Sequence, residues 1–252
     1  MNSVQPSLLE ALPYPLLSHQ KPIHPKGFET RKPHLVREPE SPRLNHELIQ
    51  QSLNHLVDLS LMTSQAGEHQ QFAKEHSLHR LIGNIYTPHS VTLTPLIRAQ
   101  ALLLHMPELA KLRCRISKQT AAWVWGYLAE NTPSVHADFD KNHRINPLAA
   151  GRENLITHQV KTVPFDFIML DQLAVTTPLR TALDLLCHAE STLEINRVVA
   201  SMILDEKNSG CSLHKIHRIL LNTKYLHGKH AALERLPAIE ELLRNNSTYA
   251  KS

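Results

Sequence analysis

The chain has 252 residues, 42% of them hydrophobic, so it is long enough to bury a core in one or two domains. Only 5% are aromatic, so leucine, alanine and valine must fill most of that core. Lys and Arg exceed Asp and Glu by 27 to 23, a net charge of +4 that permits a nucleic-acid partner without indicating one.

The cysteines and the hydropathy pattern bear on the compartment. Cys114, Cys187 and Cys211 are too few and too scattered for a disulfide framework, which favours a reducing cytoplasm. The sequence has no run of about 20 apolar residues that would predict a membrane span. It also lacks the basic segment followed by an apolar core that is typical of a signal peptide. We therefore expect a cytoplasmic protein without a membrane partner.

The first segment, 1–43, holds half of the sixteen prolines. Proline fixes its own φ and has no amide hydrogen, so a segment this rich in proline does not sustain a helix or a central strand. We predict an extended, largely disordered tail that ends near residue 43.

The next segment, 44–92, has the element order of a small winged helix-turn-helix. The spacing predicts a helix over 44–61, a short helix over 68–76, and a hairpin over 77–86 that turns at Gly83 and Asn84. The short helix, which would enter a DNA groove, carries more acidic than basic side chains. We therefore interpret the module as a degenerate one.

The central segment begins with a helix over 95–110, opened by Thr94 as the N-cap and Pro95 at the first helical position. A short strand over 112–116 follows. Arg113 and Arg115 lie on the same side of this strand, because alternate residues of a strand share a face.

A helix over 117–128 holds both tryptophans of the chain, Trp123 and Trp125. Two residues on a helix are separated by about 200° of rotation, so the two indoles face opposite sides. We predict that Trp125 is the buried one, packed with Ala121, Ala122 and Leu128, and that Trp123 makes a shallower contact. Gly126 would allow a neighbouring backbone to approach this helix.

The last segment predicts a sheet and then helices. Strand patterns cover 135–139, 155–160, 165–170 and 173–176. Thr177 then caps a helix with Pro178 at its first position, and Arg180 and Asp184 stand one turn apart on that helix. Further helices are expected over 192–206, 212–223 and 229–244. The fold class is therefore α+β, or mixed α/β: a degenerate winged module followed by a mixed sheet domain with flanking helices over 93–245.

Three stretches together resemble the AbiEi family of antitoxins. They are the hairpin stretch 81–86, the tryptophan stretch 116–126, and 175–185, which contains Thr177, Pro178, Arg180 and Asp184. Their order and spacing fit the family from about residue 77 to 235. The resemblance implies a winged helix-turn-helix joined to an α/β antitoxin domain. Trp123, Trp125 and Gly126 belong to its structural motif.

The resemblance also implies a function. Members of the AbiEi family are bacterial DNA-binding transcriptional autoregulators, and they are the antitoxins of type IV toxin–antitoxin systems. The implied partners are promoter or operator DNA and a nucleotidyltransferase toxin encoded beside the antitoxin and neutralised without a stable complex. The residues expected to meet DNA are Arg80, Asn84, Arg113, Arg115 and Lys118. The alternative for these side chains is that they form an ordinary solvated surface. The alternative for the protein is an adaptor whose helix-turn-helix no longer binds DNA.

Catalytic and metal-binding patterns were considered as well. The chain has no glycine-rich phosphate loop, no nucleophile elbow and no paired zinc-binding histidines, so we expect no enzyme and no cofactor. Arg180 and Asp184 are interpreted as a structural ion pair that ties the helix to the sheet. Cys211, His214 and His217 lie one helical turn apart, but a single cysteine without a paired cysteine motif does not predict a metal site.

Overall fold

The computed structural model describes residues 54–61, 66–106, 114–130, 134–140, 154–160 and 166–249. Within these ranges the chain forms a three-stranded sheet and a five-stranded sheet with helices around them, the α+β class that the sequence predicts. The predicted tail over 1–43 lies outside the described residues.

The smaller sheet is antiparallel and has the strand order β1-β3-β2. Strand β1 covers Val57–Asp58, β2 covers Leu78–Ile82 and β3 covers Ile85–Pro88. Helix α2, Ala66–Glu75, precedes the β2–β3 hairpin, as the sequence predicts. The hairpin turns at Gly83, whose φ of 55° is easily adopted only by glycine.

The helix expected over 44–61 does not reach Leu61, and residues 44–53 lie outside the described part of the chain. Its last residues form β1 and a single 3-10 turn, η2, over Leu59–Leu61. The carboxylate of Asp58 accepts hydrogen bonds from the backbone N–H and the hydroxyl of Ser60, at 2.9 and 2.6 Å. This local side-chain pairing competes with helix formation.

Helix α3, Pro95–His105, joins the two sheets. Thr94 caps it through a hydrogen bond from the backbone N–H of Ile97, so the predicted start is confirmed. The chain leaves the helix at Met106, before the predicted end at residue 110, and residues 107–113 lie outside the described part of the chain. The helix packs against β2 on one side and against the larger sheet on the other. As a result, the hairpin and the larger sheet share one hydrophobic core, to which the hairpin contributes Leu81, Ile82 and Ile85.

The larger sheet is mixed and has the order β6-β5-β4-β8-β7. Its strands are β4 (Cys114–Ile116), β5 (Val135–Asp140), β6 (Leu155–Val160), β7 (Phe167–Leu170) and β8 (Leu173–Thr176). Strands β4 and β8 are parallel neighbours, and so are β5 and β6. All four predicted strands over 135–176 are confirmed, as is the β7–β8 hairpin.

The tryptophan helix is shorter than expected. Helix α5 covers Lys118–Val124, and Trp125 is already its C-cap. Gly126 has a φ of 90° and ends the helix, and no described residue other than its two chain neighbours has an atom within 4 Å of where its Cβ would be. The prediction that Gly126 admits a neighbouring backbone is therefore wrong: this glycine provides the backbone conformation that lets the chain turn away.

The assignment of the two tryptophans to buried and shallow positions is reversed. Trp123 is 1% exposed, whereas Trp125 is only half-buried. The indole N–H of Trp125 donates to the carbonyl oxygen of Thr176 at the end of β8, at 2.7 Å. Trp123 instead faces α3, which covers the side of α5 that the sequence pattern left open.

The remaining described chain is helical. Helix α6 covers Pro178–His188, followed by α7 (Leu193–Leu204), the short α8 (Glu206–Ser209), α9 (Leu213–Asn222) and α10 (Lys229–Tyr249). Thr177 caps α6 by accepting a hydrogen bond from the backbone N–H of Arg180. From α10, the buried guanidinium of Arg235 donates to the carbonyl oxygens of Leu185 and Leu186, which closes the end of α6.

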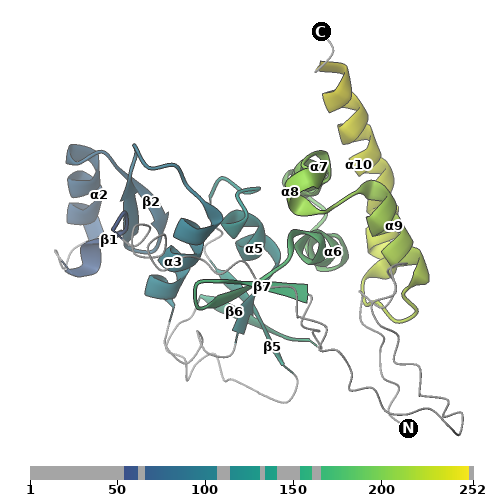
Figure 1. The fold of residues 1–252 in the computed structure, drawn as a ribbon, viewed down its shortest axis with the longest axis horizontal. Coiled ribbons are helices and arrows are strands. Elements are labelled where there is room, and N and C mark those ends of the chain that lie inside the picture. Colours follow the sequence, from purple (N-terminus) through teal and green to yellow (C-terminus); the bar gives the residue numbers. More distant parts are fainter. Residues whose placement is uncertain are drawn as a thin grey trace, which may run out of the picture.

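These elements are arranged in a row. The small sheet and α2 lie at one end of the molecule, α7 to α10 lie at the other, and the large sheet with α3 and α5 lies between them (Figure 1). Helix α6 packs against α5 on one side and against α7 and α10 on the other. No helix among the described residues is long and apolar enough to cross a membrane.

Candidate functional site

A polar cluster gathers where β4 and β8 end. Because these two strands are parallel neighbours, α5 and α6 both begin at the same edge of the sheet. Ser117 and Lys118 follow β4, and Thr177 follows β8. In open sheets with parallel strands, ligands commonly bind outside the carboxyl ends of the strands. A ligand-binding site is therefore expected at this edge of the sheet.

Lys118 has an unusual backbone and an unusual environment. Its φ of 51° lies in the left-handed region, which a residue with a Cβ adopts at a cost. Its ammonium nitrogen lies 3.1 Å from Nε2 and 3.2 Å from Nδ1 of His158. Burial lowers the pKa of Lys118, and the charges of Asp138 and Asp184 act in the opposite direction. Backbone strain of this kind is often found at functional sites.

Two histidines from neighbouring strands stand beside Lys118. The rings of His136 on β5 and His158 on β6 are parallel, with an interplanar angle of 2°, and Nδ1 of His136 lies 3.3 Å from Nε2 of His158. Burial and the Lys118 charge lower the pKa of His158 to about 4, and the same two causes lower the pKa of His136. Both shifts favour the neutral imidazole at pH 7.

Asp138 lies on β5, two residues after His136. It is 1% exposed and is registered directly opposite His158 in the β5–β6 pair. One of its carboxylate oxygens accepts a hydrogen bond from the hydroxyl of Ser117 at 2.8 Å. Burial, and then the nearby Asp184, raise the pKa of Asp138 to about 7.

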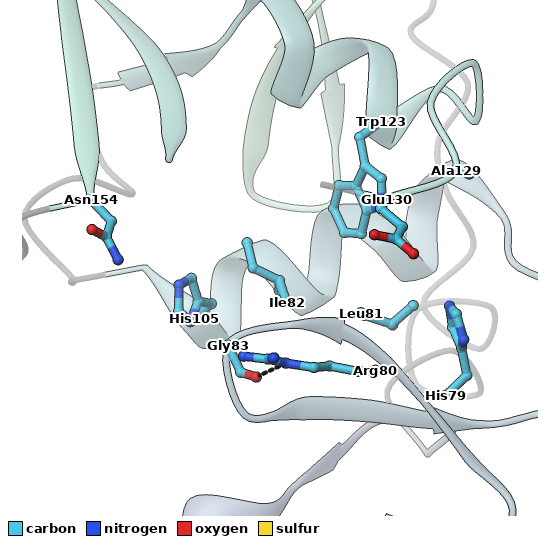
Figure 2. Close-up of a pocket in the computed structure, with 10 residues that line it drawn as sticks. All are labelled: His79, Arg80, Leu81, Ile82, Gly83, His105, Trp123, Ala129, Glu130 and Asn154. Carbon is cyan, nitrogen blue, oxygen red and sulfur yellow. Dashed lines mark hydrogen bonds between the residues drawn. The ribbon is translucent and has the colours of Figure 1, made fainter. Parts of the chain in front are cut away.

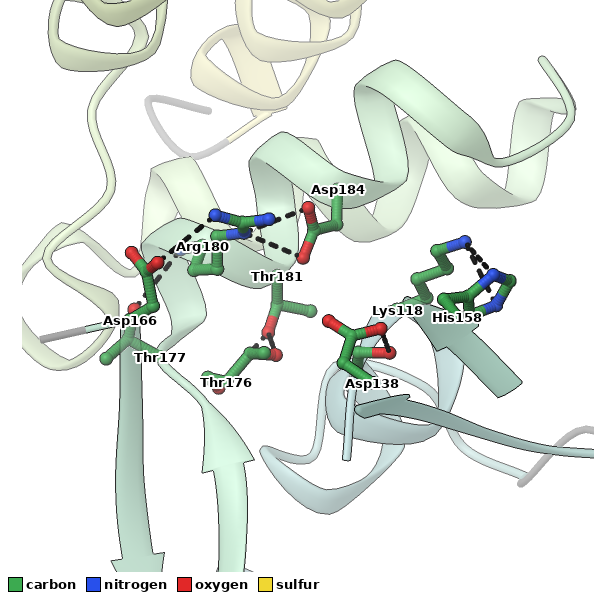
Figure 3. Close-up of polar contacts among 10 residues, drawn as sticks. Lys118, Asp138, His158, Asp166, Thr176, Thr177, Arg180, Thr181 and Asp184 are labelled. Atoms are coloured by element: carbon green, nitrogen blue, oxygen red, sulfur yellow. Dashed lines mark hydrogen bonds and ion pairs between the residues drawn. The ribbon is translucent and has the colours of Figure 1, made fainter. Parts of the chain in front are cut away.

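Arg180 lies between two carboxylates. Its Nε lies 3.0 Å from both carboxylate oxygens of Asp184, and its Nη1 lies 3.3 Å from a carboxylate oxygen of Asp166 (Figure 3). The side chains of Arg180, Asp184 and Asp166 are 12%, 6% and 3% exposed. Burial alone would lower the pKa of Arg180, but the two carboxylates more than offset this and raise it. The predicted ion pair between Arg180 and Asp184 is confirmed, although it is buried and extended by a third residue.

Lys118 and the histidines line a cavity. Figure 3 shows the Lys118 amine pointing at His158 on the side of the cluster away from Arg180. The cavity has a volume of about 550 Å³, and His136, His158 and His188 line it together with Lys118. Its lining also includes the exposed carboxylates of Glu130, Glu190 and Glu194. The cavity therefore has one basic part and one acidic part.

Cys211, His214 and His217 do not come together in one site. Cys211 is fully buried, whereas His214 and His217 are exposed on α9. In the part of the chain that the structure describes, no three His, Cys, Asp or Glu side chains are placed to hold one metal ion.

The hairpin carries the other candidate surface. The Nε of Arg80 donates to the carbonyl oxygen of Gly83 at 2.7 Å, which holds this exposed guanidinium at the turn (Figure 2). Asn84, also exposed, is the next residue of the turn. A second cavity of about 610 Å³ lies between the hairpin and α5 and is lined by Arg80, Gly83, Trp123 and Glu130, among others.

The five basic and polar residues predicted to meet DNA do not form one surface. Arg80 and Asn84 lie together on the hairpin, whereas Arg113 lies outside the described residues. The guanidinium of Arg115 lies 4.9 Å above the ring of Phe167, and its Nη1 is buried. Lys118 lines the histidine cavity. Among the four of these residues that the structure describes, Arg80 and Asn84 are the two that lie together on an exposed turn.

The histidines of the cavity were not predicted from the sequence. His136 and His158 are 22 residues apart, and only the pairing of β5 with β6 brings them together. A signal was nevertheless present. His136 and Asp138 alternate on one predicted strand and so share a face, and His158 occupies the next predicted strand.

No protein-family model matches the sequence, and no curated protein sequence is significantly similar to it. The fold and the two surfaces define an α+β protein with a small three-stranded sheet, a larger mixed sheet and a polar cavity. Its function has to be inferred from these residues.

Proposed function

We propose that the protein is a cytoplasmic DNA-binding transcriptional regulator of the AbiEi antitoxin type. The observation that carries this proposal is the arrangement of the small sheet. A short strand, a helix and a hairpin follow one another, and the first strand pairs with the last, giving the order β1-β3-β2. This is the arrangement of a winged helix, in which the helix before the hairpin enters a DNA groove and the hairpin contacts the backbone.

The hairpin has the chemistry of a wing. Arg80 is exposed, and its hydrogen bond to Gly83 fixes the guanidinium at the turn, so little side-chain entropy remains to be lost when it meets a phosphate. Asn84 adds an amide at the tip. On α2, Gln70, Gln71 and Lys74 are exposed, and glutamine amides are suited to hydrogen bonding with base edges.

The same helix favours one alternative. Besides Lys74, its exposed charges are Glu68 and Glu75, so this face is net acidic and would be repelled by phosphates. This observation fits an adaptor protein that no longer binds DNA. Such an adaptor predicts a protein partner that is captured by the full chain and lost when residues 1–43 are removed.

The proposal is tested with the DNA upstream of the protein's own gene. We expect the native upstream duplex to bind more tightly than a shuffled duplex of the same length and composition, as measured by fluorescence anisotropy. Equal affinity for the two duplexes would contradict specific regulation, and no binding to either would favour the adaptor.

The antitoxin role has a separate test. If a nucleotidyltransferase is encoded beside this gene, we expect co-expression of the two to restore growth that the nucleotidyltransferase alone arrests. The two proteins should nevertheless elute separately on size exclusion, because neutralisation in this family is expected without a stable complex. Unrelieved growth arrest would remove the antitoxin role and leave DNA binding to stand on its own test.

A further inference from the structure

We propose that the cavity lined by Lys118, His136 and His158 binds the phosphate group of a small phosphate monoester. This inference does not depend on DNA binding, because the cavity lies at the edge of the large sheet and the wing lies on the small one. The cavity volume of about 550 Å³ is within the usual range for a site that holds one small molecule.

The inner part of the cavity is built to meet an anion. The Lys118 ammonium contacts the two ring nitrogens of His158, at 3.2 and 3.1 Å. A protonated amine cannot form a good hydrogen bond with both nitrogens of one ring at once, because their lone pairs diverge. The ammonium therefore has donors left for a ligand, and its charge excludes a metal cation from the histidines.

The two histidines add donors at the same place. A neutral imidazole carries one N–H, and which nitrogen carries it adjusts to the partner. His136 and His158 have parallel rings beside one another, so each can turn one N–H toward an oxygen bound at Lys118. Phosphate is the small anion whose oxygens accept several such hydrogen bonds in different directions.

The acidic groups decide which phosphate compound fits. Burial lowers the pKa of Lys118, and the charges of Asp138 and Asp184 oppose this shift and so favour the protonated ammonium. Glu130, Glu190 and Glu194 form the outer part of the cavity, where they would repel a second phosphate and accept hydrogen bonds from hydroxyl or amino groups. A monoester with one phosphate and a hydroxyl-bearing body, such as a sugar phosphate or nucleoside monophosphate, meets both requirements.

The first experiment uses inorganic phosphate as the probe and ¹⁵N-histidine NMR as the readout, at constant ionic strength set with chloride. The signals of His136 and His158 are assigned from His136→Gln and His158→Gln. We expect saturable shifts in these two signals and a higher pKa for both rings in phosphate, because a bound anion favours the imidazolium. The exposed His217 on α9 should not respond.

Lys118→Met and Lys215→Met form a matched pair of variants. Lys215 is also half-buried and also has its ammonium in a hydrogen bond, but it lies on α9 and its partner is the carbonyl oxygen of Gly210. We expect Lys118→Met to abolish the phosphate response and Lys215→Met to keep it, with thermal melts confirming that both variants fold. If Lys118→Met fails to fold, His136→Gln and His158→Gln provide the test, and each should weaken binding several-fold. A response unchanged in these variants, or no saturable response in the wild type, would overturn the proposal.

The second experiment separates a monoester from free phosphate. Isothermal titration with ribose 5-phosphate should give binding that is roughly ten-fold tighter than with inorganic phosphate. Glu190→Gln combined with Glu194→Gln should reduce this gain and leave inorganic phosphate binding in place. Equal affinities for the two ligands would assign the cavity to free phosphate and overturn the monoester.

Discussion

The guanidinium carbon of Arg98 lies 5.4 Å from the ring centroid of Trp123, and the same guanidinium donates hydrogen bonds to the carbonyl oxygens of Trp123 and Leu128. One buried arginine of α3 therefore holds both the indole and the carbonyl groups at the end of α5. This contact joins α3, which packs against the β2–β3 hairpin, to α5, which begins at the polar cavity.

The first prediction follows from the burial of the two tryptophans. Trp123→Ala should lower the free energy of unfolding by roughly 3–5 kcal/mol, because it leaves a cavity and removes the ring that covers Arg98. Trp125→Phe should lower it by only about 1 kcal/mol, since a smaller aromatic ring still fills most of this half-buried position and the hydrogen bond to Thr176 is lost. Urea denaturation measures both values. A larger loss at Trp125 would restore the opposite assignment of the two indoles.

The second prediction concerns the buried ion cluster around Arg180. Arg180→Met removes the charge that balances Asp184 and Asp166. The free energy of unfolding at about pH 7 should therefore fall by roughly 3–5 kcal/mol. Urea melts of the wild type and of Arg180→Met at about pH 7 measure the loss, with the exposed Arg197→Met on α7 as control. A loss as small as that of the control would show that the cluster contributes nothing to stability.

The third prediction is the pH dependence caused by Asp138. Its pKa is about 7 in the folded protein and about 3.9 in an unfolded chain, so the folded state binds more protons between these values. The contribution of protonated Asp138 to stability is complete below about pH 4 and is lost as the pH rises through 7. Asp138→Asn removes this dependence and keeps an acceptor for the Ser117 hydroxyl.

The stability of Asp138→Asn relative to the wild type should therefore increase with pH, by up to about 1.4 kcal/mol per pH unit across this window. Urea titrations at about pH 5 and about pH 8 give the comparison. His158 acts in the opposite direction, because its lowered pKa destabilises the fold as the pH falls toward 4. Its effect is present in both proteins and cancels in the difference. A difference that does not change with pH would mean that Asp138 titrates normally.

The fourth prediction uses the backbone of Lys118. Glycine adopts a positive φ without the steric cost of a Cβ, so Lys118→Gly should be about 1 kcal/mol more stable than Lys118→Ala. Both variants lack the ammonium, so both should lose phosphate binding. Thermal melts and the phosphate titration measured on the same samples test the two statements separately. Equal stability of the two variants would indicate that the backbone at this position is not strained.

The sequence predicts the parts of this fold that depend on local chemistry. The Gly83–Asn84 turn and the caps Thr94–Pro95 and Thr177–Pro178 are each specified by two adjacent residues, and each lies where it was expected. The end of α5 was misplaced, because Gly126 is compatible both with the interior of a helix and with a positive φ. Only the structure distinguishes the two.

The parts that could not be predicted depend on distant segments. The burial of Trp123 needs α3, whose Arg98 lies 25 residues earlier in the chain. The cavity depends on the pairing of β5 with β6, which places His158 beside His136. It also depends on the left-handed backbone of Lys118, which a lysine in the sequence does not predict. The amphipathic patterns of these segments identify a buried face but not which element covers it.

The most direct test of the proposed function is the salt dependence of DNA binding by Arg80→Ala. The affinity of the wild type for its upstream duplex should fall steeply as potassium chloride is raised, since binding releases counterions from the phosphates. Arg80→Ala should bind roughly ten-fold more weakly and reduce the slope of log affinity against log salt by about one, whereas the exposed Arg197→Ala should match the wild type. Wild-type binding that does not change with salt, or identical slopes for the two variants, would contradict a DNA-binding wing at Arg80.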